Sequence, residues 1–400
     1  MKYMFFNLLT ACSFLTPSQP IISDEPVTSF TQGHYSQWPN GPSTSESFFP
    51  LAVWLQNPSR AEQFRQAGFN VYIGLWKGPT ENQLSQLKAA GMKVICDQNE
   101  VALRNLEDPT IIGWMHGDEP DNAQALKEGD GYGPPILPSK ILEDYQAIKK
   151  ADPSRPVLLN LGQGVAWDNY IGRGVRRNHP EDYPEYVQGC DIASFDIYPA
   201  VHRDPEIAGN LWYVGRGVER LIEWSKPRTV WNCLECTHIS NVDRKPTPHE
   251  VRCEAWMSII HGSRGLIYFI HQFKPVFREA ALLDDPEMLR AVTNLNHQIT
   301  DLAPVINSPT IADAVHVVTE PDDAPIATML KKHGETTYLF AVGMRNQKTE
   351  ATFQIYDMTG QIKVNVIGED RSLTANNGSF QDVFEPWDVH LYRLKNLGLK

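Results

Sequence analysis

IIGWMHGDEP at residues 111–120 and TVWNCLEC at residues 229–236 are the stretches that decide the expected fold. Each is a short apolar run bounded by polar residues, which is typical of a buried strand leaving a sheet. Glu119 closes the first run and Glu235 the second. Two carboxylates at the ends of buried strands are therefore the first candidates for a functional site.

Six further apolar runs share this texture, and amphipathic stretches separate most of them. The eight expected strands cover residues 48–56, 69–75, 93–98, 111–117, 156–162, 191–198, 228–235 and 264–272. The expected helices cover residues 59–67, 80–90, 139–150, 211–224, 248–261 and 291–306. Strand and helix units repeated eight times predict an α/β fold, a (β/α)8 TIM barrel, over residues 47–308. In such a barrel the functional residues gather at the C-terminal ends of the strands.

Two connections in this barrel are irregular. Residues 99–109 leave room for only a short helix, and residues 163–189 form a long connection with no clear period. After Pro309 the pattern changes to strand-like alternation, as in residues 336–342, 351–356 and 389–394. Residues 309–400 are therefore expected to form an antiparallel β-sandwich accessory domain.

The N-terminus has the features of an export signal. One cation, an apolar run and small residues precede Cys12, and residues 9–12 resemble a bacterial lipobox. We expect residues 1–11 to be a lipoprotein-type signal peptide, Cys12 to be lipidated, and residues 12–46 to be a flexible tether rich in Pro, Ser and Thr. The protein would then be exported and anchored to a bacterial membrane, with a periplasmic or secreted form as the alternative. A chance match to the lipobox or a misassigned start codon also stays open.

Charge and cysteine content exclude several classes of function. The formal net charge of −12 argues against a general nucleic-acid binder, which needs a basic surface. Without Cys12 an odd number of cysteines remains, so a disulfide scaffold is not expected. Cys233 and Cys236 lie three apart on a predicted strand and should point to opposite faces, which disfavours a metal pair.

The positions of Glu119 and Glu235 resemble the clan A glycoside hydrolases, a superfamily of retaining enzymes. The resemblance covers residues 48–307 and implies an acid/base at the end of barrel strand four, here Glu119, and a nucleophile at the end of strand seven, here Glu235. It implies a β-glycoside hydrolase that acts on a poly- or oligosaccharide and needs no cofactor. Asp118 stands where clan A members usually carry Asn, which puts in doubt the group bound at the sugar 2-position and raises a swap of roles with Glu119.

The chemistry of glycoside cleavage fits these roles. One carboxyl protonates the departing oxygen while the other meets the anomeric carbon, and in a retaining enzyme the two stand about 5–5.5 Å apart. Glu119 must begin protonated, and a neighbouring carboxylate would raise its pKa. As an alternative, the acidic turn at Asp118 and Glu119 could simply cap a helix.

Further residues are expected to line the site at the same end of the barrel. Asp196 and Tyr198 close the sixth strand, and the resemblance implies Tyr198 as the hydrogen-bond partner of the nucleophile; a packed ring at a loop entry is its alternative. His271 and Gln272 close the eighth strand, although a lone His is more often structural. The aromatic candidates for stacking on sugar rings, each of which could instead be core, are Trp54, Trp76 and Trp167.

A cluster of three arginines lies in the long connection. Arg173, Arg176 and Arg177 could engage sulfate or carboxylate groups of an anionic polysaccharide, because guanidinium contacts such groups in a bidentate way. The alternative is that they pair with the acidic residues close by in sequence, which are Glu181, Asp182 and Glu185.

Two rival functions remain at the level of sequence. A barrel that binds sugar without cleaving it would need one of the two glutamates to point elsewhere. A metal-dependent hydrolase would use acidic residues or His at the strand ends, namely Asp97, His116, Asp118 or Asp196. The chain has no H-x-H or H-E-x-x-H spacing to support a metal site, so none is predicted.

Overall fold

The computed structural model describes residues 34–126 and 130–396. The predicted signal peptide, Cys12 and the first part of the predicted tether lie outside these residues. Within them, no helix is both long and apolar enough to cross a membrane.

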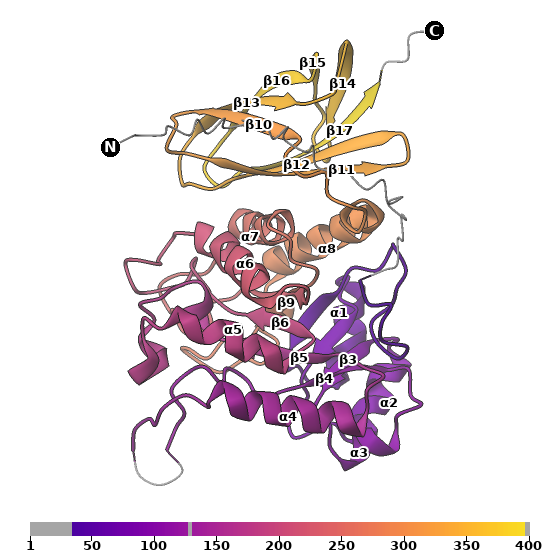
Figure 1. The fold of residues 1–400 in the computed structure, drawn as a ribbon, viewed down its shortest axis with the longest axis vertical. Helices are drawn as coiled ribbons and strands as arrows, with labels where there is room; N and C mark the ends of the chain where they lie inside the picture. The colour runs from indigo at the N-terminus through magenta and orange to yellow at the C-terminus, as the bar shows by residue number, and fades with distance from the viewer. Residues whose placement is uncertain (1–33, 127–129, 397–400) are drawn as a thin grey trace, which may run out of the picture. The chain divides into compact units, whose positions relative to one another are not determined.

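Parallel strands form a closed barrel in the lower part of Figure 1. Its strands are β1 (Leu51–Trp54), β2 (Val71–Ile73), β3 (Lys93–Cys96), β4 (Ile111–Met115), β5 (Val157–Leu161), β6 (Ile192–Phe195), β7 (Thr229–Val230), β8 (Asn232–Glu235) and β9 (Leu266–Phe269). The hydrogen-bonded order is β7-β6-β5-β4-β3-β2-β1-β9-β8. Only Trp231 separates β7 from β8, so these two are halves of the seventh barrel strand and the ring is complete. The eight predicted strands are confirmed.

Helices cover the outside of the barrel. They are α1 (Ala61–Gln66), α2 (Glu81–Ala89), α3 (Glu100–Arg104), α4 (Pro138–Ala151), α5 (Tyr183–Tyr186), α6 (Trp212–Ser225), α7 (Pro248–Ile260) and α8 (Pro286–Ile306). Short 3-10 turns are η1 (Pro58–Arg60), η2 (Gln163–Val165), η3 (Ile171–Arg176), η4 (Pro180–Asp182), η5 (Val187–Gly189) and η6 (Ala281–Asp284). Thr80 and Thr247 begin α2 and α7 with capping boxes, in which side chain and backbone at the helix start satisfy each other.

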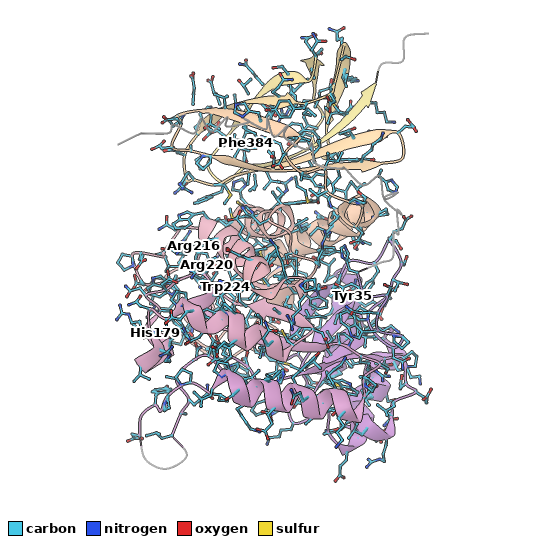
Figure 2. All side chains as sticks on the ribbon, viewed as in Figure 1. Tyr35, His179, Arg216, Arg220, Trp224 and Phe384 are labelled. Atoms are coloured by element: carbon cyan, nitrogen blue, oxygen red, sulfur yellow. The ribbon has the colours of Figure 1, made fainter. Side chains whose placement is uncertain are left out.

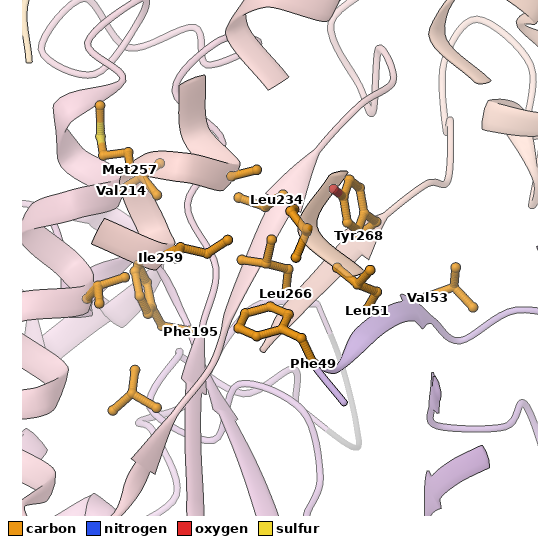
Figure 3. Packing of buried hydrophobic residues seen from close by; sticks show 14 of the residues in the cluster. Phe49, Leu51, Val53, Phe195, Val214, Leu234, Met257, Ile259, Leu266 and Tyr268 are labelled. Carbon is orange, nitrogen blue, oxygen red and sulfur yellow. The ribbon is translucent and has the colours of Figure 1, made fainter. Parts of the chain in front are cut away.

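Alternation along the strands divides the core in two. One set of side chains fills the barrel and includes Ala52, Ile73 and Cys233. The other set packs between strands and helices, as Figure 3 shows for Leu51, Phe195, Leu234 and other residues. Cys236 belongs to this second set, so Cys233 and Cys236 face different parts of the core, as the strand pattern predicted. The cysteines of the described chain are all free and buried.

The tether prediction is wrong for residues 34–46. Tyr35 and Trp38 are 4% and 6% exposed and pack with the barrel interior (Tyr35 is labelled in Figure 2). The Tyr35 hydroxyl donates to the carbonyl of Arg264 at 3.1 Å and accepts from Nε1 of Trp231 at 3.0 Å. Because Arg264 precedes β9 and Trp231 lies at the start of β8, this segment closes the N-terminal end of the barrel, opposite the end where function is expected.

The C-terminal part is an eight-stranded antiparallel sheet, as expected for a β-sandwich. Its strands are β10 (Val315–Glu320), β11 (Ile326–His333), β12 (Thr336–Gly343), β13 (Thr349–Ile355), β14 (Gln361–Val366), β15 (Ser372–Asn376), β16 (Ser379–Phe384) and β17 (Val389–Asn396), in the order β10-β13-β16-β15-β14-β17-β12-β11. It has its own apolar core around Phe353, Phe380 and Tyr392. Arg252 of α7 donates to the carbonyl of Val389 at 2.9 Å, which ties the sheet to the barrel helices.

Candidate functional site

A cluster of carboxyl groups lies where β4 and β6 end. Glu119 follows β4 and Asp196 follows β6, and their carboxyl groups lie close enough for each to shift the pKa of the other. Tyr198 lies beside Asp196, and Asn122 lies beside Glu119. All four side chains are partly exposed, so the cluster is open to a ligand. The structure therefore brings together Glu119, Asp196 and Tyr198, three of the residues that the sequence nominated.

The backbone at Glu119 is strained. Its φ is +44°, in the left-handed region that costs a non-glycine residue roughly 1–3 kcal/mol and that clusters at functional sites. Its amide donates to the carbonyl of Asn160 at 3.1 Å, and its carbonyl accepts from the amide of Asn122 at 3.1 Å, so neighbouring segments hold the turn. The turn interrupts strand alternation, and the carboxyls of Asp118 and Glu119 both belong to the cluster.

A polar network that the sequence analysis missed crosses the barrel beneath these carboxyls. Nδ2 of Asn160 on β5 donates to Asp118 at 3.0 Å. Oδ1 of Asn160 in turn accepts from the Ser194 hydroxyl on β6 at 2.8 Å. Asn160 interrupts the apolar run VLLNL, and a polar residue inside a buried strand was the signal that could have revealed it.

Burial and mutual repulsion raise the pKa of each carboxyl in the cluster. Burial and then the charge of Asp118 raise the pKa of Glu119 to about 7. Burial and then the proximity of Glu119 raise the pKa of Asp196 well above its usual range. Burial also raises the pKa of Asp118, although its side chain keeps contact with water. The raised pKa values favour the protonated form of both carboxyl groups, so Glu119 can serve as an acid near neutral pH.

Glu235, the predicted partner of Glu119, is held by the loop that follows β6, and its role as nucleophile stays a prediction. Glu235 is fully buried, and its two carboxyl oxygens accept from the amides of Ala200 and Val201 at 2.5 and 2.9 Å. Glu254 of α7 lies beside it, and burial raises the pKa of Glu235 to about 8. The alternation of side chains along a strand predicts on which side of the sheet a strand-end residue lies. It does not predict which loop will form hydrogen bonds with its carboxyl group. Glu235 here anchors the loop that follows Asp196 and Tyr198.

The three predicted tryptophans have different surroundings. Trp54 is 5% exposed and belongs to the barrel interior. Trp167 is 3% exposed and packs against Tyr170 and His202, with ring centroids 5.8 and 5.5 Å apart. Trp76 is 67% exposed, so it alone among the three presents an open ring to a sugar.

His271 and Gln272 serve local structure. Nε2 of His271 lies 3.3 Å from Nε2 of Gln56, and burial lowers the pKa of His271 to about 4, which keeps it neutral. Nε2 of Gln272 donates to the carbonyl of Val276 at 3.2 Å. The rings that the sequence analysis missed are the neighbours Phe273 and Phe277, both substantially exposed.

The anion-binding hypothesis is wrong for Arg173 and Arg176. Arg173 is 1% exposed and donates to Asp182 at 2.8 Å, to the carbonyl of His179 and to the carbonyl of Asp121. Arg176 forms a bidentate pair with the same Asp182. Pairing with nearby acidic residues, the alternative from the sequence, is what the structure shows for these two.

Arg177 has a different environment from the other two arginines. It is exposed and bonds to the side-chain oxygen of Asn169. The same connection is fixed to α6, because Asp168 pairs with Arg216 at 3.3 Å and with Arg220 at 2.7 Å (Figure 2). Since a neutral amide leaves the charge of Arg177 uncompensated there, an anionic ligand at Arg177 stays a prediction.

No group of three or more metal-ligating side chains suited to an ion occurs in the described part of the chain. The carboxyl of Asp118 accepts from the amide of Asn160, and those of Glu119 and Asp196 lie beside each other. Acid/base chemistry by carboxyl groups is what this arrangement can do directly.

Comparison with known proteins shows the fold. No protein-family model and no curated protein matches the sequence. In structure the chain is similar to an alpha-amylase from Geobacillus thermoleovorans complexed with acarbose, with a TM-score of 0.53 and 10% identity over 89% of this chain and 100% of that one. It is also similar to Gan42B, a GH42 beta-galactosidase from G. stearothermophilus, with a TM-score of 0.56 and 8% identity over 87% and 98%. The class defined is a (β/α)8 barrel with a C-terminal β domain.

Proposed function

We propose that this protein is a glycoside hydrolase that acts on a poly- or oligosaccharide, with Glu119 as the catalytic acid. The observation that carries the proposal is the partly open carboxyl cluster at the C-terminal mouth of the barrel, in which Glu119 has a pKa raised to about 7. An acid with a pKa near the working pH is suited to protonate a departing glycosidic oxygen. The proton that Glu119 donates stays on the released hydroxyl group, and Glu119 takes up a new proton from water before the next turnover.

The group that meets the anomeric carbon has two candidates. The retaining, double-displacement route predicted from the sequence requires the Glu235 carboxylate to leave the amides of Ala200 and Val201 and attack that carbon. The second candidate is inversion, in which Asp118 takes a proton from a water that attacks the anomeric carbon while Glu119 protonates the leaving oxygen. Asp118 is exposed and accepts a hydrogen bond from Asn160, so its carboxyl group is accessible to such a water.

A polysaccharide panel tests the activity and the route together. Xylan, β-mannan, mixed-linkage β-glucan, alginate and carrageenan are incubated with wild type, Glu119→Gln, Asp118→Asn and Glu235→Ala, and reducing ends and product anomers are read out. We expect Glu119→Gln to lose at least a hundredfold in kcat, the typical contribution of general acid catalysis. Full activity of Glu119→Gln would overturn the proposal.

The product anomer then separates the two routes. Retention, together with rescue of Glu235→Ala by azide as a glycosyl azide, would assign Glu235 as the nucleophile. Inversion with loss of activity in Asp118→Asn would assign Asp118 as the base. If wild type binds these glycans without releasing reducing ends, the sugar-binding barrel takes the place of the hydrolase.

Export and lipid anchoring belong to the same proposal. The pattern of residues 1–12 supports attachment at Cys12, which would place the enzyme at a bacterial outer membrane or cell surface, where polysaccharides are met. Radiolabelled palmitate incorporated by wild type and not by Cys12→Ala would support it. Equal labelling of both proteins would contradict it.

A further inference from the structure

A short loop after β9 carries exposed aromatic rings in a fixed position. We call residues 272–278 the aromatic loop. Gln272 and Arg278 exchange two backbone hydrogen bonds at 2.9 and 2.8 Å, which close the loop at its base. The amide of Phe273 donates to the carbonyl of Ile239 at 2.6 Å, which ties the loop to the segment after β8. The rings are therefore held on an anchored backbone.

The aromatic loop exposes an unusual amount of apolar surface. Phe273, Val276 and Phe277 are 47%, 64% and 59% exposed. Each Å² of apolar surface left in water forgoes about 25 cal/mol of burial, and clustered exposed rings commonly mark a binding surface. His271 stacks under Phe273 with an interplanar angle of 6°, so a buried, neutral ring supports the exposed one.

A continuous row of rings joins this loop to the carboxyl cluster. Ring centroids are 5.4 Å apart for Tyr198 and Phe269, 6.0 Å for Phe269 and Phe273, and 5.9 Å for Phe273 and Phe277. At the inner end Tyr198 lies beside Asp196, which lies beside Glu119. The row thus begins at the acid and ends in solvent.

We propose that the aromatic loop is a distal subsite that binds sugar rings of the same glycan chain whose linkage lies at Glu119. This rests on the proposed function. The flat faces of Phe273 and Phe277 suit the C–H face of a pyranose, and the continuity of the row with Tyr198 identifies a chain that extends from the site as the occupant.

The test compares long and short substrates. Phe273→Ala and Phe277→Ala are assayed on the panel polysaccharide that wild type cleaves fastest and on the matching single-sugar aryl glycoside. We expect KM for the polymer to rise about threefold to tenfold for each ring, since one aromatic contact contributes about that much. The kcat/KM for the aryl glycoside, which cannot reach the loop, should change less than twofold.

Two variants serve as controls. Phe277→Tyr keeps the ring and should keep the polymer KM. Tyr356→Ala removes a ring of 51% exposure in the C-terminal sheet and should behave as wild type. An unchanged polymer KM in both alanine variants would overturn the subsite and leave the proposed hydrolase standing.

A binding assay makes the subsite testable even where hydrolysis fails. Affinity electrophoresis through gels that contain xylan, β-mannan or alginate should retard wild type and retard Phe277→Ala less. Equal mobility of the two proteins in every gel would overturn the subsite, whether or not the protein is a hydrolase. Sedimentation of wild type, but not Phe277→Ala, with phosphatidylglycerol vesicles would also overturn it, since it would assign the loop to a membrane surface.

Discussion

Replacing Asp118 with Asn should shift the pH dependence of the enzyme in a defined direction. Burial, followed by the charge of Asp118, raises the pKa of Glu119 from 4.5 to about 7, a rise of 7 − 4.5 = 2.5. Burial is the larger cause and solvent screens the exposed Asp118, so we assign to that charge about one pH unit, or about 1.4 kcal/mol. Asn keeps the oxygen that accepts from Asn160 and removes only the charge.

The sign follows from the role of Glu119 as an acid. The enzyme is active while Glu119 is protonated, so kcat/KM falls as pH rises through its pKa. A lower pKa therefore moves the basic limb of the profile down by about one pH unit in Asp118→Asn. The profile of kcat/KM from pH 4 to 9 on the best panel substrate measures it.

A matched variant separates this effect from a general change of charge. Asp243→Asn also removes one carboxylate charge, but in an exposed loop after β8. It should leave the basic limb of the pH profile where it lies in wild type. If the basic limb of the kcat/KM profile of Asp118→Asn lies at the same pH as in wild type, or at a higher pH, the assignment of Glu119 as the acid is refuted. Complete loss of activity with wild-type stability would instead assign Asp118 a direct role as base.

Three further predictions concern stability. Arg173→Ala should lower the free energy of unfolding, measured in urea, by about 3–5 kcal/mol, because it leaves Asp121 and Asp182 without their buried partner. Replacing the exposed Arg177 with Ala should change it by less than about 0.5 kcal/mol. Equal effects of the two substitutions would contradict the internal pairing of Arg173. Tyr35→Phe should cost about 1–3 kcal/mol by leaving Nε1 of Trp231 unpaired, and no change in urea midpoint would mean that this end of the barrel is not closed as described. Burial lowers the pKa of Lys331 to about 7, so between pH 7 and 10.5 the unfolded chain binds more protons than the folded chain. The free energy of unfolding should therefore rise with pH across that window, and Lys331→Met should flatten the rise. Parallel plots of unfolding free energy against pH for wild type and Lys331→Met would show that Lys331 is not the cause of the rise.

The barrel could be predicted from sequence because its strands are apolar runs buried on both faces. Residues 156–162 and 191–198 matched β5 and β6 to within a few residues. The segment around Tyr35 and Trp38 could not, because its Pro, Gly and Ser content predicts a tether, and only long-range partners such as Trp231 reveal its burial.

The site was predictable in part. Strand ends placed Glu119 and Asp196 at one mouth, and that much followed from fold topology alone. The capture of Glu235 by two backbone amides depends on the path of a loop, and the left-handed turn at Glu119 on local strain. Neither leaves a periodic signal in the sequence, so both features emerged only from the structure.

The segment that closes the base of the barrel has a consequence for how the chain folds during synthesis. Tyr35 emerges early, yet its partners Trp231 and Arg264 follow 196 and 229 residues later. At a translation rate of about 5–20 residues per second, roughly ten to fifty seconds pass before the last of them leaves the ribosome. Until then Tyr35 and Trp38 lack the barrel residues against which they pack in the folded protein. Contacts between residues so far apart in sequence slow folding, so we expect this segment to pack late.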